Sequence, residues 1–341
     1  MRNATIGDIA REAAVGKATV SRVINSSGYV SEETRRKVVR VMERLNYHPS
    51  AAAQTLSRQA SDTIGLILPE VSNQFFSEIL KGVSEMVDGH GYTLMLSSSE
   101  NDPSRDFRAL RAMIGQRVRG LVYIPASDYT EEPLRGQLRR LLDQFSCPIV
   151  LLDRPLEAFS FDTVMSDNLK GGYMAARALV RAGHRRIGVV AGDPDLFIGR
   201  ERLNGVRQAL RESGMPLREE DIIPGKFDER ITFERALERF RQGDCPTGFV
   251  LSNNLSAFGF LRAAEKAKLR IPEDVAFVSF DKLAGQELYG LPYTYLDRHE
   301  TSQGRQAMQA LFRRLESPDR PVERIVDPPD LVLKGSERRM P

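Results

Sequence analysis

Residues 5–25 read TIGDIAREAAVGKATVSRVIN, and this stretch predicts two short helices joined by a tight turn. Thr5 is a typical N-cap, and the inner face of the first helix carries apolar residues at helical spacing, namely Ile6, Ile9, Ala10 and Ala13. Residues 14–16 form the turn, and Val20 and Val23 face inward from the second helix. The outward positions of the second helix are polar, basic or small: Lys17, Ala18, Thr19, Ser21, Arg22 and Asn25.

A short helix with such a surface fits the major groove of double-stranded DNA, where side chains read base edges. A third helix from about Ser31 to Leu45, with Val38, Met42 and Leu45 inward, completes a three-helix headpiece. The chain has a formal net charge of +3, whereas residues 1–60 alone hold ten Lys/Arg and five Asp/Glu. A basic head on a near-neutral body is typical of a DNA-binding module, so we expect double-stranded DNA as a partner.

The composition of the whole chain is that of an ordinary globular protein. Its 341 residues, 41% apolar and 28% charged, are enough for more than one domain. Cys147 and Cys245 give no metal-ligand spacing, and we expect no metal and no cofactor. No apolar signal segment opens the chain and no run could span a bilayer, so we expect a cytoplasmic protein that does not use a membrane.

From Thr63 onward, apolar strands alternate with amphipathic helices such as 75–87, 175–182 and 202–211. This α/β alternation predicts parallel sheets with right-handed crossovers. The number of strands fits two doubly wound lobes better than one sheet. The predicted strands are 64–68, 93–97, 120–124, 149–152, 164–166, 187–191, 248–251 and 275–280, with a short strand at 222–223.

The pattern predicts three parts: a helix-turn-helix headpiece (1–48), a linker (49–61) and a two-lobe body (62–341). The linker segment Ser50–Arg58 is too short to be a stable helix alone in water. It is either a flexible linker or a hinge helix that folds only when paired on DNA. In the body we assign about 62–160 and 293–323 to the first lobe, and about 161–292 and 324–335 to the second.

Six ordered motifs resemble the lactose/galactose repressor family of bacterial transcription regulators. They are KATVSRV (17–23), GYVSEETR (28–35), NYHP (46–49), TIGL (63–66), GHRRI (183–187) and IPEDV (271–275). The resemblance spans almost the whole chain. It implies a homodimer whose periplasmic-binding-protein-like body binds a small effector and gates binding to a palindromic operator. The tail after Leu333 lacks the heptads of a tetramerising bundle, which favours the dimer.

The resemblance also implies roles for single residues of the headpiece and linker. Lys17, Ala18 and Arg22 would read base edges, because Lys17 donates to guanine and the Ala18 methyl contacts thymine. Thr19, Ser21 and Asn25 would hold phosphates, which position the protein without specifying sequence. Leu56 matches the wedge that opens a central base step in the minor groove. The remaining residues expected at the DNA are Thr5, Tyr29 and Ala53.

Two positions of the headpiece depart from the family pattern. Ala14 replaces the usual turn glycine, and it would be strained if the turn needs a positive φ. Gly16 replaces the usual serine cap of the second helix. Glycine caps a helix nearly as well as serine, within a few tenths of a kcal/mol, but it offers no hydroxyl to a phosphate.

Ligands of doubly wound lobes bind beyond the C-terminal ends of the strands. The residues expected there, which also match effector contacts in the family, are Phe75, Phe76, Asp153, Arg202, Phe227, Asn253, Asp281 and Arg298. Asp, Asn and Arg side chains bind hydroxyls, and Phe rings stack on a sugar ring, so this set suits a polyhydroxy ligand. The alternatives are helix N-caps for Asp153 and Asp281 and a core role for one of the two phenylalanines. His184 is more typical of a structural residue.

The family commonly carries Asp at two positions that are Asn254 and Lys282 in this chain. With Arg298 nearby, these changes favour an anionic effector, a sugar acid or sugar phosphate, over a neutral sugar. Gln74, where proline is common, is similar to the gluconate-type members. The alternatives are a regulator without any small-molecule effector and a cytosolic sugar-binding protein. An enzyme is not expected, because the sequence has no GxSxG elbow, no phosphate loop and no His paired with a nucleophile.

Overall fold

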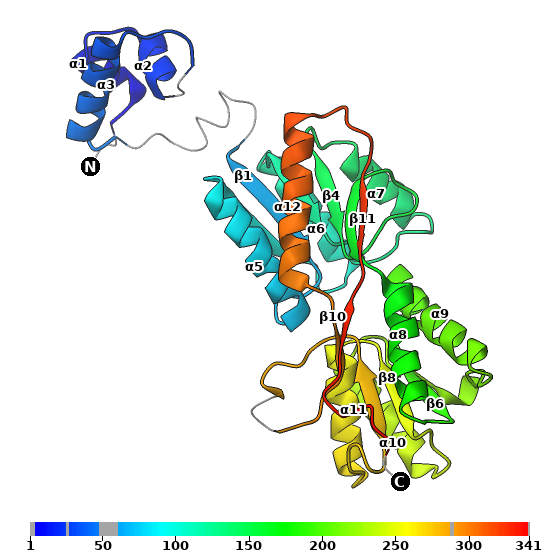
Figure 1. Ribbon diagram of the computed structural model, residues 1–341. Coiled ribbons are helices and arrows are strands. Elements are labelled where there is room, and N and C mark those ends of the chain that lie inside the picture. The colour runs from blue at the N-terminus through cyan, green and yellow to red at the C-terminus, as the bar shows by residue number, and fades with distance from the viewer. Residues whose placement is uncertain (1–3, 25–26, 48–60, 287–289, 340–341) are drawn as a thin grey trace. The chain divides into compact units, whose positions relative to one another are not determined.

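The computed structural model describes residues 4–24, 27–47, 61–286 and 290–339. Along the sequence they divide into two compact units, with the boundary between Asp62 and Thr63 (Figure 1). Of the predicted linker at 49–61, residues 49–60 lie outside the described residues, among them Ala53 and Leu56, and so does Asn25. Within the described ranges, no helix is long and apolar enough to cross a membrane.

The first unit contains α1 (Ile6–Glu12), α2 (Lys17–Ile24) and α3 (Glu32–Arg44) around a small apolar core. Thr5 caps α1 in a capping box, because its hydroxyl accepts from Asp8 N and its own N–H donates to Asp8 Oδ2 at 3.0 Å. Ser31 caps α3 by accepting from Thr34 N at 3.3 Å. The inner stripe of α3 differs slightly from the prediction, because Val38 and Val41 are buried and Met42 and Leu45 pack at the core's edge.

The turn between α1 and α2 requires a left-handed residue. Ala14 has a φ of 51°, which is the conformation that glycine adopts freely and alanine does not. The departure at position 14 therefore carries backbone strain, as predicted for a positive φ at this position.

In the second unit, one sheet has the order β11-β5-β4-β3-β1-β2 and every pair of neighbours is parallel. Helices α5 (Gln74–Gly89) and α12 (Glu300–Glu316) pack on one face. Helices α6 (Pro103–Gly115) and α7 (Leu134–Leu142) cover the other. The strands are β1 (Thr63–Leu68), β2 (Thr93–Ser98), β3 (Gly120–Tyr123), β4 (Ile149–Leu152), β5 (Asp162–Ser166) and β11 (Arg324–Asp327).

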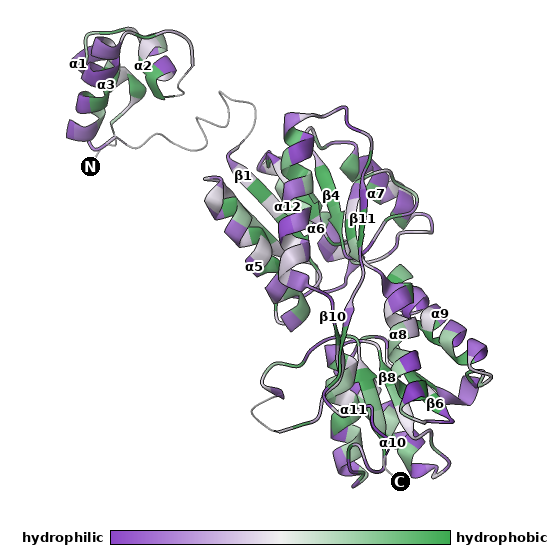
Figure 2. Cartoon of the chain, in the orientation of Figure 1, coloured by the Kyte–Doolittle hydropathy of each residue, from purple (hydrophilic) through white to green (hydrophobic). Residues whose placement is uncertain are grey.

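The other sheet has the order β12-β10-β9-β8-β6-β7, with only β12 antiparallel to its neighbour. Helices α8 (Asn168–Arg181) and α9 (Phe197–Glu212) cover one face, and α10 (Glu229–Arg241) and α11 (Asn254–Lys266) cover the other. Figure 2 shows hydrophobic strands beneath helices whose outer faces are hydrophilic. The strands are β6 (Ile187–Ala191), β7 (Ile222–Pro224), β8 (Gly248–Leu251), β9 (Ala276–Ser279), β10 (Tyr295–Asp297) and β12 (Asp330–Val332).

These two sheets confirm the predicted two-lobe, doubly wound fold, but the crossing points between lobes differ from the predicted ones. The segment 161–166 belongs to the first lobe, because β5 pairs with β4. Residues 295–297 belong to the second lobe, because β10 pairs with β9. The segment 324–327 belongs to the first lobe as β11, beside β5, and not to the second lobe as predicted. The chain therefore crosses between lobes three times, after β5, after β10 and after β11.

Candidate functional site

The outward face of α2 is the candidate DNA-reading surface of the headpiece. Lys17, Ala18 and Arg22 are exposed on it, and Thr19 and Ser21 are half-buried beside them. The first turn of α2 carries no acidic residue. The partial positive charge at the N-terminus of α2 would therefore attract phosphate groups without an acidic side chain opposing it. Of the other residues expected at the DNA, Thr5 is exposed at the start of α1 and Tyr29 is 91% exposed before α3.

All the effector-binding residues expected from the sequence line one cavity between the two lobes. This inner cavity has a volume of about 40 Å³. It shares lining residues, among them Arg154 and Phe227, with a wider cleft of about 1010 Å³. The structure thus brings together Phe75, Phe76, Asp153, Arg202, Phe227, Asn253, Asp281 and Arg298.

The strand ends position these side chains, as expected for doubly wound lobes. Phe75 and Phe76 lie in the first turn of α5, whose N-cap Asn73 accepts from Phe75 N at 3.0 Å. Both rings are buried and both line the cavity, so neither is a core residue alone. Asp153 and Phe227 follow β4 and β7 with φ values of 61° and 60°, so tight left-handed turns aim them at the cavity.

Asn253 and Asp281 both serve the N-terminus of α11. Asn253 is its N-cap and accepts from Ser256 N at 2.8 Å. Asp281 accepts from Asn254 N at 3.1 Å. Neither Asp153 nor Asp281 is the N-cap of a described helix, which was the alternative to a binding role. Asn253 combines both roles, because it caps α11 and its amide nitrogen donates to Phe227 O at 3.4 Å beside the cavity.

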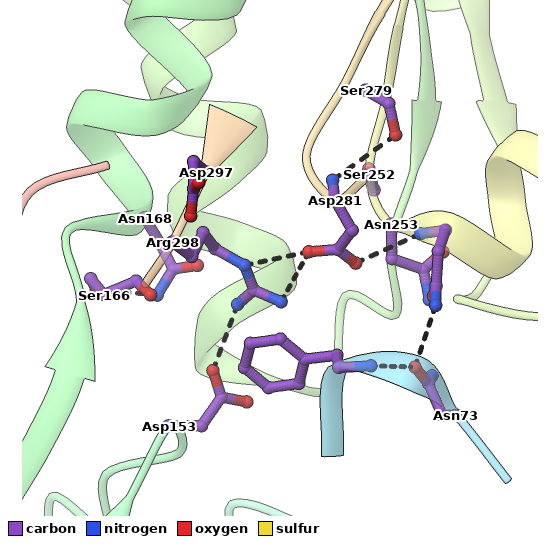
Figure 3. A network of polar contacts seen from close by, with 12 residues as sticks. Asn73, Asp153, Ser166, Asn168, Ser252, Asn253, Ser279, Asp281, Asp297 and Arg298 are labelled. Carbon is purple, nitrogen blue, oxygen red and sulfur yellow. Dashed lines mark hydrogen bonds and ion pairs between the residues drawn. The ribbon is translucent and has the colours of Figure 1, made fainter. Parts of the chain in front are cut away.

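Arg298 links the two lobes through a buried ion-pair network (Figure 3). It is 3% exposed, its Nη2 lies 2.6 Å from Asp281 Oδ1, and its Nη1 donates to Asp153 Oδ1 at 3.2 Å. Its guanidinium carbon stacks 3.6 Å from the centre of the Phe75 ring. Burial disfavours the charge, but Asp281 and Asp153 outweigh it and raise the pKa of Arg298.

This network corrects the charge argument made from the sequence. Arg298 is neutralised by two carboxylates, so it supplies no spare positive charge to an effector. Lys282 is half-buried and is not among the residues found to line the inner cavity or the cleft. Neither residue therefore carries the prediction of an anionic effector.

Arg202 lies in the second turn of α9, which begins at Phe197 rather than at Arg202 as predicted. It is 2% exposed, and its Nε donates to Asn168 Oδ1 at 2.8 Å. Its guanidinium carbon lies 4.5 Å from the centre of the Phe280 ring and 5.5 Å from that of Phe227. Burial lowers the pKa of Arg202 to about 9.

Several residues at or beside the site were not predicted from the sequence, among them Arg154, Asn73 and Asp128. Arg154 is 5% exposed and lines both the inner cavity and the cleft. Asn73 accepts a hydrogen bond of 2.9 Å from Asn254 Nδ2, which joins the two lobes directly. Asp128, after β3, forms an ion pair of 2.9 Å with Arg200 of α9. Their signal in the sequence is only proximity to strand ends, because their partners lie far away in the chain.

His184 has the structural role expected of it. It is 1% exposed, its Nδ1 lies 2.9 Å from Thr247 Oγ1, and its Nε2 lies 3.1 Å from Glu337 O. Burial lowers the pKa of His184, so the ring is neutral at physiological pH.

Comparisons with known proteins agree with both parts of the chain. Residues 5–50 match the family of bacterial regulatory proteins named lacI, and residues 61–325 match the periplasmic binding proteins and sugar binding domain of the LacI family. The chain is 31% identical to the HTH-type transcriptional repressor PurR of Haemophilus influenzae (strain PittEE), with 98% of each chain covered. It is 30% identical to the ribose operon repressor of Haemophilus influenzae (strain ATCC 51907 / DSM 11121 / KW20 / Rd), again with 98% of each covered.

Solved structures show the same architecture. The transcriptional regulator CelR in complex with cellobiose is 29% identical, covers 98% of this chain and 99% of its own, and superposes with a TM-score of 0.73. The lac repressor dimer bound to operator and the anti-inducer ONPF is 24% identical with a TM-score of 0.83, and it supports the fold alone. The chain therefore belongs to the lacI family of bacterial regulatory proteins and is a DNA-binding transcription regulator.

Proposed function

We propose that this regulator is a repressor that binds a palindromic operator as a homodimer and is gated by a small effector in the inner cavity. One observation carries the proposal: side chains from both lobes, held at strand ends, converge on one cavity between them. Ligand sites of doubly wound lobes lie at this edge of the sheets. The relatives that are named repressors support the same direction of control.

The proposed mechanism is a population shift between two arrangements of the lobes. An effector that contacts both lobes binds one arrangement more tightly and so favours it. The three crossovers after β5, β10 and β11 are the segments about which the lobes would move. The changed arrangement would then alter how the two linkers of a dimer pair on the operator, with Leu56 as the wedge.

We further propose the division of labour expected from the sequence. Residues 1–48 read DNA, 49–61 act as hinge, and the body binds effector and partner subunit. The regulator would work in the cytoplasm, at the nucleoid when bound to its operator. It would carry out no catalysis, in keeping with relatives that are transcription repressors.

The test combines operator selection with ligand screening on the full-length protein. Genomic fragments retained by the protein should share a palindrome, and Lys17→Ala should change base preference within it. A ligand that binds only the folded state raises the melting temperature, with about 2.7 kcal/mol of stabilisation at a hundredfold excess over its Kd. Such a ligand should also change operator affinity. Retention without a shared palindrome, or stabilising ligands without any effect on operator binding, would contradict the proposal.

A second variant tests the hinge. Leu56→Ala should weaken operator binding while leaving salt-dependent binding to nonspecific DNA nearly intact, because the wedge acts only where the central step opens. Equal loss of specific and nonspecific binding would show that Leu56 is not a wedge.

A further inference from the structure

Arg298 stands on the segment that crosses from the second lobe to the first. It directly follows β10 of the second sheet and precedes α12, which packs on the first sheet. Its carbonyl oxygen accepts a hydrogen bond of 2.5 Å from Gln303 Nε2 of α12. The same amide nitrogen donates to Ser166 Oγ of β5 at 2.8 Å. The main chain of Arg298 is therefore anchored to the first lobe.

From this anchor the guanidinium of Arg298 reaches the second lobe. Its Nε donates to Asp281 Oδ1 at 2.9 Å, and its Nη2 lies 2.6 Å from the same oxygen. Asp281 follows β9 and is 3% exposed, so water is excluded from this contact. Charge-assisted hydrogen bonds are strongest in such surroundings. The arginine thus joins an anchor on one lobe to a carboxylate on the other.

The first lobe supplies a second set of contacts to the same guanidinium group. Asp153, after β4, accepts from Nη1 at 3.2 Å, and the Phe75 ring lies 3.6 Å from the guanidinium carbon. If the lobes moved apart, the guanidinium would have to leave one of its two carboxylates. Breaking a buried ion pair is costly, because the charges left behind are poorly hydrated.

These contacts belong to a closed ring that passes through both lobes (Figure 3). Its members, each in contact with the next, are Arg298, Asp281, Asn254, Asn73, Phe75 and again Arg298. The inner cavity that remains has a volume of about 40 Å³, which is room for a few water molecules. The protein's own side chains therefore make the contacts between lobes that a bridging ligand would make.

We infer that Arg298 is an internal tie that closes the two lobes in the absence of any effector. Closed here means the arrangement in which Asn73 and Asn254 are in contact. A group that contacts both lobes favours the arrangement in which it does so. Arg298 is part of the chain and therefore always present at a high effective concentration. The tie lies in the site of the proposed function, on which its regulatory consequence rests: the operator meets a closed body when effector is absent.

A second ion pair between the lobes is weaker. Asp128, after β3, pairs with Arg200 of α9 at 2.9 Å, but the Arg200 side chain is 41% exposed. Ion pairs open to solvent contribute little, because water and salt screen them. Arg298 is therefore the stronger of these two charged links.

The first experiment removes the tie without leaving buried charges. A triple variant combines Arg298→Met, Asp153→Asn and Asp281→Asn, and the amide oxygen introduced at position 281 can still accept from Asn254 N. The full-length variant is compared with the parent by small-angle scattering and by hydrogen exchange of peptides covering 73–76 and 252–256. We expect a larger radius of gyration and exchange that is about tenfold faster or more in these peptides, because they become accessible when the lobes open.

The matched control makes the same three kinds of replacement in a network confined to the second lobe. Arg186 pairs there with Asp221 at 2.8 Å and with Asp244 at 2.6 Å. Arg186→Met with Asp221→Asn and Asp244→Asn should lower the melting temperature. It should leave the radius of gyration and the exchange of both peptides unchanged. Equal opening in the two triple variants would overturn the inference.

Chemical rescue tests the guanidinium group itself. Arg298→Ala leaves a space between the same carboxylates, and methylguanidinium at millimolar concentration, too dilute to denature, should fill it. Slow exchange of both peptides should return saturably, whereas methylammonium and sodium chloride at equal ionic strength should have no such effect. Faster exchange that methylguanidinium does not reverse would overturn the assignment. If Arg298→Ala does not fold, the first triple variant decides alone.

Operator affinity separates this inference from the proposed function. Lobes that open in the first triple variant, with a changed affinity for operator, would support both. Opened lobes with unchanged operator affinity would support the tie and contradict the proposed gating. Lobes that stay closed in that variant would overturn the tie and leave the proposed function standing.

Discussion

At the scale of one residue, Ala14 stands where a left-handed backbone is needed. Its φ of 51° costs an L-amino acid about 1–2 kcal/mol, of which glycine's greater freedom in the unfolded chain offsets about 0.5–1. We therefore expect Ala14→Gly to stabilise the headpiece by up to about 1 kcal/mol. Hydrogen exchange of the amides in residues 5–47 of the full-length protein measures this change.

Gly28 offers a matched control in the same unit. Its φ is 69°, so Gly28→Ala introduces the strain that Ala14→Gly removes, and exchange in the headpiece should become faster. The same sign of effect from both substitutions would contradict the argument from backbone strain.

A second residue, Arg298, should be sensitive to substitution because it pairs with two buried carboxylates. Arg298→Met leaves Asp153 and Asp281 buried without their partner, which typically costs about 3–5 kcal/mol. Thermal unfolding at pH 7 should show this loss. Arg298→Lys, which keeps a positive charge beside the two carboxylates, should lose less stability. An equal loss from both variants would show that Arg298 acts by packing alone.

At the scale of elements, His299 ties together the segments that cross between lobes. It lies between β10 and α12, and its ring nitrogens lie 3.3 Å from Asp327 at the end of β11 and 3.2 Å from Asp330 at the start of β12. Partial burial disfavours the charged ring, but Asp327 and Asp330 outweigh it and raise the pKa of His299 above its usual value near 6.5.

The pH dependence follows from this direction. Because the folded pKa lies above the unfolded one, the ionic contribution is complete below pH 6.5 and is lost as pH rises through the folded pKa. His299→Gln should therefore lower the melting temperature at pH 6 more than at pH 8.5. The lowered pKa of His184 has the opposite sign and cancels when the variant is compared with the parent protein. A difference that grows with pH would contradict the assignment.

The same elements show what the sequence pattern could predict. Central strands such as β1 and β8 are buried apolar runs, and the alternation with helices located them within a residue or two. Strands β10, β11 and β12 are three or four residues long and mix apolar with polar residues, so they carried no such signal. They lie at two of the three crossovers, those after β10 and after β11, which is why these lobe boundaries were misplaced while the fold was predicted. The strand at 164–166 was predicted but assigned to the wrong lobe, because the pattern does not show that β5 pairs with β4.

At the scale of the whole molecule, the candidate site was predictable only in part. The C-terminal ends of strands can be located in the sequence, so Asp153 and Asp281 could each be assigned to the ligand-binding edge of a sheet. Whether a charge there is paired depends on contacts across the lobes. Arg298 was expected to be a free cation and is neutralised, whereas Arg154, which was not predicted at all, is buried beside it and donates to Asn101 Oδ1 and Pro125 O.

The balance between lobe arrangements should depend on the hydrogen bond from Asn254 to Asn73. Asn254→Asp replaces the donor with a carboxylate that faces the Asn73 oxygen. The loss of a buried hydrogen bond, about 1–3 kcal/mol, should lower the melting temperature by a few degrees and increase the radius of gyration in small-angle scattering.

Asn73→Asp is the control for that substitution. It keeps an acceptor for both Phe75 N and Asn254 Nδ2, and it places a negative charge at the start of α5. The melting temperature should stay the same or rise. If both variants behaved alike, this contact would not hold the lobes together.

The last helix of the first lobe has a consequence for how the protein is made. Met308 and Leu311 of α12 complete a core begun by Ile64 of β1 and Ile79 of α5, more than two hundred residues earlier in the chain. At about 5–20 residues per second, synthesis reaches α12 roughly ten seconds or longer after α5, and the core of the first lobe is incomplete during that time. The headpiece, whose core needs nothing beyond Tyr47, emerges first. During synthesis, the DNA-binding headpiece can therefore fold before the effector-binding body that would regulate it is complete.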